Sequence, residues 1–214
     1  MIFKNYIFDW SGTLVDDMGP TLEATNAVFQ CYGKPTMNRE EFRTHFRLPY
    51  SEFYAEYVPN VALCELEQHF REAFAASIVP VTILPHAHEK LVWCQSQGIR
   101  CFILTSMDSA TFEAQLDDLD LRHFFEATYS GVIDKRQLIG SILTTHNLNP
   151  QETAYFGDMV HDIETAKHGA VCSVALLTGY TKMPELLEAK PDWLVADYAE
   201  FFQIIASQEN KISV

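Results

Sequence analysis

The stretch Asn5-Tyr6-Ile7-Phe8-Asp9-Trp10-Ser11-Gly12-Thr13-Leu14-Val15-Asp16 stands near the N-terminus of this 214-residue chain. Residues 6–8 form a short apolar run of the kind that becomes a buried parallel strand. Asp9 follows where this strand is expected to end, and residues 11–13 favour a turn. Because ligands of open α/β sheets bind beyond the carboxyl ends of the strands, we expect Asp9 to face a phosphate or a metal ion.

The bulk composition is typical of a globular protein, with 48% hydrophobic and 21% charged residues. The chain is long enough for one large domain or for a core with a smaller insert. No apolar run reaches the roughly 18 residues of a membrane span, and the N-terminus lacks the basic region and cleavage site of a secretory signal. We therefore expect a cytoplasmic protein without a membrane partner.

The net charge of −14 argues against nucleic acid or an anionic membrane as the partner, because no basic stripe is present to neutralise phosphates. A small phosphate remains compatible with this charge where a cation mediates its binding. The five cysteines are scattered without Cys-x-x-Cys spacing, which indicates reduced thiols and not a zinc or disulfide framework. Nothing in the sequence specifies an oligomeric state.

Helical patterns alone fill the segment from residue 19 to residue 81. Apolar residues recur at helical spacing over 20–32 and 62–77, and Asn38 is a candidate N-cap for a helix reaching about residue 46. A short helix starting near residue 51 ends at Pro59. These patterns predict a helical insert between two α/β segments.

Strand and helix patterns alternate after residue 83. Apolar strands are predicted at 99–104, 124–129, 153–156, 171–177 and 193–195, with helices at 86–98, 109–116, 137–146 and 162–168 and at the C-terminus. This alternation predicts a Rossmann-like α/β fold with a doubly wound parallel sheet. We assign residues 1–17 and 83–214 to this core and residues 18–82 to an inserted α-helical cap domain.

Polar groups follow three further predicted strands, at the edge of the sheet where Asp9 is expected. Thr105 and Ser106 end the strand at 99–104, and Lys135 precedes the helix predicted at 137–146. The segment Gly157-Asp158-Met159-Val160-His161-Asp162 follows the strand at 153–156. Phosphoryl transfer depends on positioning and charge stabilisation, which carboxylates, a lysine and hydroxyl donors can supply together.

In order and spacing, these motifs resemble those of the haloacid dehalogenase superfamily, and most closely its phosphoglycolate-phosphatase-like branch, which carries a helical cap after the first motif. The resemblance implies a Mg²⁺-dependent phosphatase acting on a small phosphorylated metabolite, with an aspartyl-phosphate formed on Asp9. The catalytic residues it implies are Asp9, Ser11, Thr105 and Lys135. The phosphate or substrate contacts it implies are Gly12, Thr13, Thr105, Ser106, Lys135 and Arg47. The metal ligands it implies are Asp9, Ser11 through its backbone carbonyl, Asp158 and Asp162, the last either directly or by steering the other groups.

The chain departs from the family pattern at two positions. Lys135 is followed by Arg136 where proline is common, and Ser11 stands where the family has a second aspartate that acts as general acid and base. A serine hydroxyl cannot take up and release a proton near neutral pH as a carboxylate does, and general acid–base catalysis is worth about 10²–10⁴-fold. We therefore expect a competent metal and phosphate site with slow or specialised turnover, which Ser11→Asp should raise.

Three alternatives remain open on the sequence. A degenerate member of the family would bind a phosphorylated ligand or a partner protein without turnover. A phosphonate-cleaving relative resembling phosphonoacetaldehyde hydrolase would need a cap lysine, and residues 35–89 contain none. A dehalogenase would lack the metal-ligating Gly-Asp pair that residues 157 and 158 provide.

Overall fold

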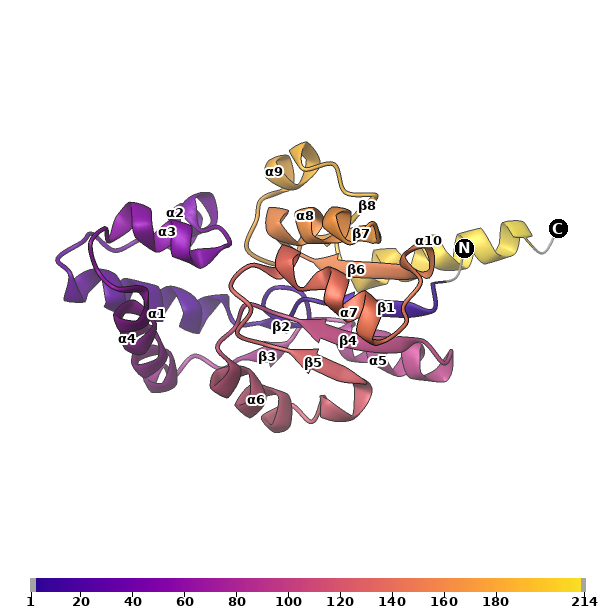
Figure 1. Ribbon diagram of the computed structural model, residues 1–214, viewed down its shortest axis with the longest axis horizontal. Helices are drawn as coiled ribbons and strands as arrows, with labels where there is room; N and C mark the ends of the chain where they lie inside the picture. Colours follow the sequence, from indigo (N-terminus) through magenta and orange to yellow (C-terminus); the bar gives the residue numbers. More distant parts are fainter. Residues whose placement is uncertain (1–2, 213–214) are drawn as a thin grey trace.

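The computed structural model describes residues 3–212, with side chains described to residue 207. Its centre is a six-stranded sheet in the order β5-β4-β1-β6-β7-β8, in which every neighbouring pair is parallel. The strands are β1 (Asn5–Phe8), β4 (Arg100–Leu104), β5 (Ala127–Tyr129), β6 (Thr153–Gly157), β7 (Cys172–Leu176) and β8 (Trp193–Val195). The predicted α/β class with a doubly wound parallel sheet is thereby confirmed, and β1 occupies the middle of the sheet (Figure 1).

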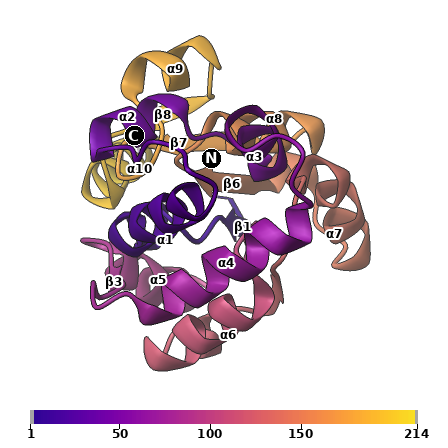
Figure 2. The ribbon, with the colours of Figure 1, turned by 90° about the vertical axis from the view of Figure 1, so that its left-hand side faces the viewer.

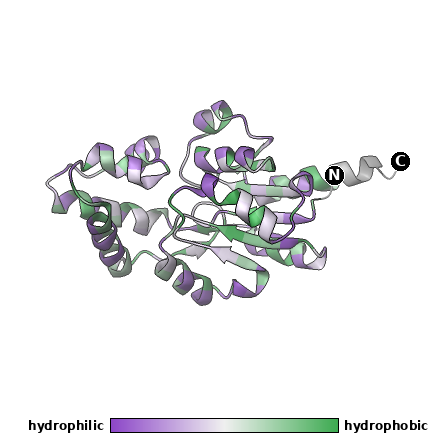
Figure 3. Ribbon diagram, in the orientation of Figure 1, coloured by the Kyte–Doolittle hydropathy of each residue, from purple (hydrophilic) through white to green (hydrophobic). Residues whose placement is uncertain are grey.

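Helices cover both faces of this sheet, which is why its strands are apolar on both sides. Tyr6 and Phe8 belong to a cluster that includes residues of α5 (Ala87–Ser96), α6 (Ser109–Asp118) and α10 (Tyr198–Ile212). Ile7 points the other way, into a cluster with residues of α7 (Ile139–Thr145) and α8 (Val160–His168). Figure 3 shows the hydrophobic strands enclosed by helices of mixed hydropathy.

Four of the five helices between β1 and β4 form the inserted cap, here called the cap helices: α1 (Met18–Cys31), α2 (Arg39–His45), α3 (Tyr50–Tyr57) and α4 (Leu63–Ala76). They are set off to one side of the sheet in Figure 1, and Figure 2 shows α1 and α4 packed against each other. Their own apolar cluster includes Phe29, Phe42 and Phe53. An antiparallel pair, β2 (Val15–Asp16) and β3 (Thr82–Ile83), joins the insert to the core.

Some of the helix caps and element boundaries agree with those predicted from the sequence, and others differ. Asn38 caps α2 as predicted, accepting hydrogen bonds from the backbone of Glu40 and Glu41. The helix predicted at 137–146 begins later, at Ile139, because residues Lys135–Gln137 form a 3₁₀ turn. The Asp134 side chain caps this turn by accepting a hydrogen bond from the Arg136 N–H. Short elements without a readable period were not predicted: β2, β3, α9 (Met183–Glu188) and the 3₁₀ turns Arg122–Phe124 and Pro150–Glu152.

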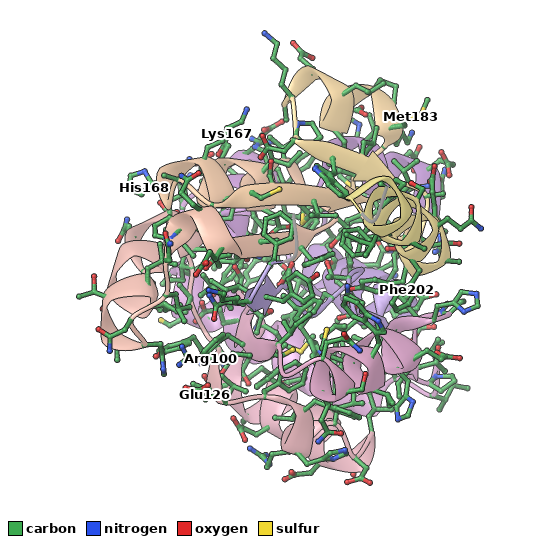
Figure 4. All side chains as sticks on the ribbon, turned by 90° about the vertical axis from the view of Figure 1, so that its right-hand side faces the viewer. Arg100, Glu126, Lys167, His168, Met183 and Phe202 are labelled. Atoms are coloured by element: carbon green, nitrogen blue, oxygen red, sulfur yellow. The ribbon has the colours of Figure 1, made fainter. Side chains whose placement is uncertain are left out.

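The end of the molecule opposite the cap helices carries a two-point ion pair. Arg100, at the start of β4, donates through Nε and Nη2 to the Glu126 carboxylate at 2.7 and 2.6 Å, and the two residues lie together in Figure 4. This pair joins the start of β4 to the residue before β5.

No described helix is both long and apolar enough to span a bilayer, and the cytoplasmic location stays a prediction.

Candidate active site

The carboxyl ends of β1 and β6 bring three buried carboxylates together. Asp9 directly follows β1, Asp158 directly follows β6, and Asp162 lies in the first turn of α8. One oxygen from each lies within 4.8 Å of one from each of the others, and none of these residues is more than 3% exposed. The parallel topology therefore places the sequence-predicted residues of two motifs in one cluster.

Lys135 enters this cluster as its cation. Its Nζ lies 3.0 Å from Asp9 Oδ2 and 2.6 Å from Asp162 Oδ1, and the side chain is fully buried. Burial favours a lower pKa for Lys135, but the charges of Asp162 and Asp9 outweigh it and hold the pKa above its ordinary value. Lys135 is therefore a charged member of the cluster, and its position does not depend on the proline that is common after it.

The negative charges of Asp9 and Asp158 are not fully balanced by the single positive charge of Lys135. Burial raises the pKa of Asp9 to about 6 against the opposing charge of Lys135. Burial also raises the pKa of Asp158 well above its ordinary value, with the charges of Asp162 and Asp9 adding to the shift. Asp9 Oδ1 has no hydrogen-bond partner among the described residues. An unpartnered buried oxygen among acidic groups with raised pKa values fits a divalent cation, and Mg²⁺ prefers oxygen ligands of this kind.

The three carboxylates are not equally available to such a cation. Both oxygens of Asp162 already accept hydrogen bonds, Oδ1 from Lys135 Nζ and Oδ2 from the Met159 N–H at 3.0 Å. Asp158 accepts from Thr13 Oγ1 at 3.0 Å and from the Tyr180 N–H at 2.7 Å. Both oxygens of Asp158 are therefore also engaged, but by neutral donors, whereas Asp162 is paired with the Lys135 cation. Asp9 Oδ1 is the one oxygen of these three carboxylates without a partner among the described residues. We therefore expect Asp9 and Asp158 to be the ligands, with Asp162 holding Lys135.

A second buried acidic group, which the sequence analysis missed, adjoins Ser11. Ser11 Oγ donates to Asp17 Oδ2 at 2.6 Å, and the Tyr180 hydroxyl donates to Asp17 Oδ1 at 2.7 Å. Burial raises the pKa of Asp17 to about 6, with the hydrogen bonds from Ser11 and Tyr180 opposing the shift. Asp16 and Asp17 are alike in the sequence, but the structure exposes the first and buries the second.

The loop after β7 supplies Tyr180, and it approaches the cluster through a glycine. A Cβ built on Gly179 would lie 2.0 Å from Asp158 Oδ2. Thr178 Oγ1 donates to the Gly12 carbonyl at 2.6 Å, which ties this loop to the turn after β1. Thr105 and Asp158 were identified because residues beyond the carboxyl ends of parallel strands meet the ligand. The same rule applies to the loop after β7 and could have identified Tyr180 from the sequence.

Gly179→Ala is expected to displace Asp158 and to weaken metal binding by about 10–100-fold, as changes to groups that support metal ligands do. Calorimetric titration of the purified protein with Mg²⁺ or Mn²⁺ measures this loss. Gly140→Ala in α7 is the matched control, because a Cβ there meets no atom within 4 Å. Unchanged metal affinity in Gly179→Ala would contradict the assignment of Asp158 as a ligand.

A cavity of about 400 Å³ opens between this cluster and the cap helices. Its core side includes Asp9, Ser11, Asp17, Thr105 and Ser106. The Ser106 hydroxyl has no partner among the described residues, and α6 takes its N-cap from Asp108, not from Ser106. Ser106 is therefore free to donate to a ligand, and its contact with phosphate or substrate stays a prediction.

Three predicted contact residues are placed elsewhere. Arg47 pairs with Glu56 and is not among the residues that line the cavity. The Gly12 and Thr13 N–H groups donate within their own turn, to the carbonyls of Val15 and Trp10. These two residues shape the turn, and the Thr13 hydroxyl orients Asp158. The sequence had assigned Arg47, Gly12 and Thr13 to phosphate or substrate contact, and in this structure none of the three presents a free donor to the cavity.

Comparison with known proteins identifies the family to which this arrangement belongs. The family model described as haloacid dehalogenase-like hydrolase matches residues 6–176. The chain belongs to this family. The match confirms the resemblance carried by the motifs around Asp9, Thr105 and Asp158.

Individual members of this family cover nearly the whole chain. A phosphoglycolate phosphatase from Synechococcus elongatus is 23% identical over 209 residues, covering 93% of this chain and 95% of the relative. A haloacid dehalogenase-like hydrolase from Streptococcus pneumoniae has a TM-score of 0.82 at 24% identity, covering 95% of this chain and 98% of its own. CbbY from Rhodobacter sphaeroides, solved in complex with phosphate, has a TM-score of 0.78 at 19% identity, covering 93% and 96%. These likenesses agree with the phosphoglycolate-phosphatase-like branch and with a cap inserted in the core.

Proposed function

We propose that this protein hydrolyses small phosphate monoesters, with Mg²⁺ held by Asp9 and Asp158 and a covalent aspartyl-phosphate formed on Asp9. The observation that carries the proposal is the unpartnered Oδ1 of Asp9, a residue that lines the cavity and contacts Lys135. The phosphatase relatives and the phosphate bound to CbbY support the same reaction class. We place the boundaries of the cap at residues 18 and 82.

The residues around the cavity have separable roles. Asp9 attacks the phosphorus, and the bond from phosphorus to the leaving oxygen breaks. Lys135 offsets the negative charge that builds up on the phosphoryl group, while Thr105 and Ser106 supply hydroxyl donors to its oxygens. Asp162 fixes Lys135 in place. Mg²⁺, when bound, offsets the repulsion between the carboxylate nucleophile and the phosphate dianion.

We assign the proton transfer that Ser11 cannot perform alone to Asp17. In the first step Asp17 Oδ2 gives its proton to Ser11 Oγ, and the Ser11 hydroxyl proton passes to the leaving alcohol oxygen. In the second step water attacks the phosphorus, its proton returns through Ser11 Oγ to Asp17, and Asp9 is released with inorganic phosphate. The 2.6 Å hydrogen bond between Ser11 and Asp17, and the position of both residues on the cavity, support this path.

The proposed function is tested by measuring phosphate release from a panel of small phosphate monoesters with and without Mg²⁺. We expect release that EDTA abolishes and that excess Mg²⁺ restores. The degenerate alternative predicts a different outcome, in which inorganic phosphate binds to the Mg²⁺-loaded protein while no ester in the panel is hydrolysed. That outcome would overturn the proposed hydrolysis.

A further inference from the structure

Apolar side chains form much of the cavity wall. The cap helices and the loop between α2 and α3 contribute Phe46, Leu48, Phe70 and Phe74, and the core contributes Met107 and Ile133. Phe70 and Phe74 lie one helical turn apart on α4, with ring centroids 5.8 Å apart. A ligand whose phosphate lies at Asp9 would place the rest of its structure against this surface.

The described residues of the cavity lining include a single arginine or lysine, and that side chain is paired with a carboxylate. Among the described residues that line the cavity, Arg71 is the one arginine or lysine, and its Nη1 lies 3.4 Å from Asp108 Oδ2. Glu67 adds a further negative charge and accepts a hydrogen bond from Tyr50 at 2.7 Å.

Two further arginines of the cap, Arg43 and Arg47, contact other protein groups. Arg43 of α2 lies within hydrogen-bond distance of the backbone carbonyls of Tyr180 and Thr181, at 3.3 and 3.5 Å. Arg47 pairs with Glu56 outside the cavity. The expectation that Arg47 would contact the phosphate or the substrate therefore has no counterpart in the contacts of this side chain.

We infer that this cavity selects phosphate monoesters whose alcohol part is an uncharged apolar or aromatic group, and that it disfavours short esters bearing a carboxylate. This inference rests on the proposed function, because it places the phosphate at Asp9. Burying an apolar group against the cap helices is favourable, whereas a carboxylate placed beside Glu67 and Asp108 loses its hydration next to two like charges, and Arg71, the one cation among the described residues of the lining, is already paired with Asp108.

The test compares 2-phenylethyl phosphate, ethyl phosphate and 2-phosphoglycolate under identical Mg²⁺ conditions. All three are esters of alkyl alcohols, so differences in kcat/KM report mainly on binding of the alcohol part and less on the leaving group. We expect 2-phenylethyl phosphate to exceed ethyl phosphate by about 10- to 100-fold, the effect of burying one aromatic ring. We expect 2-phosphoglycolate to be the poorest of the three. A ratio near one, or a preference for 2-phosphoglycolate, would overturn the inference while leaving the proposed hydrolysis intact.

A charge introduced on the apolar wall tests where this selection is made. Phe74→Lys is expected to reduce the preference for 2-phenylethyl phosphate over 2-phosphoglycolate by at least about tenfold. Ile78→Lys is the matched control, because it adds the same charge at a side chain that is 96% exposed and does not line the cavity. Equal shifts in the two variants would show that the preference is not set at the wall containing Phe74.

Binding of non-hydrolysable phosphonates separates failure of this inference from failure of the proposed function. Calorimetric titration of the Mg²⁺-loaded wild-type protein should give tighter binding for 3-phenylpropylphosphonate than for propylphosphonate, again by about 10- to 100-fold. If no ester is hydrolysed but this difference appears, the hydrolysis is refuted and the ligand class is supported. Equal affinities would refute the ligand class whether or not esters are hydrolysed.

Discussion

Asp9→Asn is expected to abolish phosphate release, lowering kcat on the order of 10⁴-fold or more, as removal of a covalent nucleophile does. An amide at this position cannot form the acyl-phosphate and is a weaker ligand for Mg²⁺ than a carboxylate. Steady-state phosphate release from the best ester of the panel measures the loss. Asp118→Asn on α6 is the matched control, because it makes the same chemical change at an exposed position outside the cavity.

The Asp9 variant is expected to remain folded, which separates loss of chemistry from loss of structure. Asp9 is one of three clustered carboxylates, and its pKa is raised to about 6 by burial. Replacing it removes a charge that is costly to bury, while Lys135 keeps its 2.6 Å contact with Asp162. A melting temperature at or above that of the wild type, measured without added metal, is therefore expected. Full activity in Asp9→Asn would refute the covalent mechanism.

The sheet and the Asp9 cluster could be predicted because both follow from short-range sequence patterns. Residues 6–8 and residues 101–104 of the strand that became β4 are apolar at every position, which indicates strands covered on both faces. Once the strands are known to be parallel, their carboxyl ends share one edge of the sheet. Asp9, Thr105 and Asp158 were identified in this way, without any long-range contact being known.

The environment of Ser11 could not be predicted, because it depends on contacts between segments far apart in the chain. Asp17 is buried and accepts a hydrogen bond from the hydroxyl of Tyr180, which lies 163 residues away in sequence. Two adjacent aspartates in a sequence give no sign of which one will be buried. Arg47 shows the same limit for the cap: arginine residues near a loop suggest an anion site, but the fold pairs this side chain with Glu56.

Asp17→Asn is expected to lower kcat by about 10²–10³-fold for esters of alkyl alcohols, which is within the range for loss of general acid–base catalysis. The amide preserves the size of the side chain but cannot pass a proton to Ser11. Asp16→Asn provides an adjacent control at an exposed carboxylate. 4-Nitrophenyl phosphate should lose much less activity, because its leaving group is weakly basic and needs little protonation. A purely structural role for Asp17 would slow all of these esters alike.

The pH dependence of the first step provides a second measure of the Asp17 role. Burial raises the pKa of Asp17 to about 6, so Asp17 keeps its proton up to about that pH and loses it above. Ionisation of Asp9, whose pKa burial also raises to about 6, activates the nucleophile over the same range. Single-turnover transfer from 2-phenylethyl phosphate to Asp9 should therefore pass through a maximum near pH 6 and decrease above it. Asp17→Asn should remove this decrease, since no carboxyl group then titrates at that position. Retention of the same decrease in the variant would contradict the assignment.

Exchanging the two residues tests whether the position of the carboxylate matters more than the identity of either residue. Ser11→Asp alone would place a second buried carboxylate against Asp17, which now accepts the Ser11 hydrogen bond at 2.6 Å. The gain in turnover expected from the sequence should therefore not appear in that single variant. In the double variant Ser11→Asp/Asp17→Ser, one carboxylate and one hydroxyl remain in contact, with the carboxylate now nearer the phosphate. We expect the double variant to be at least about tenfold more active than the single variant Asp17→Ser. A double variant no more active than Asp17→Ser would show that these two side chains do not share one proton path.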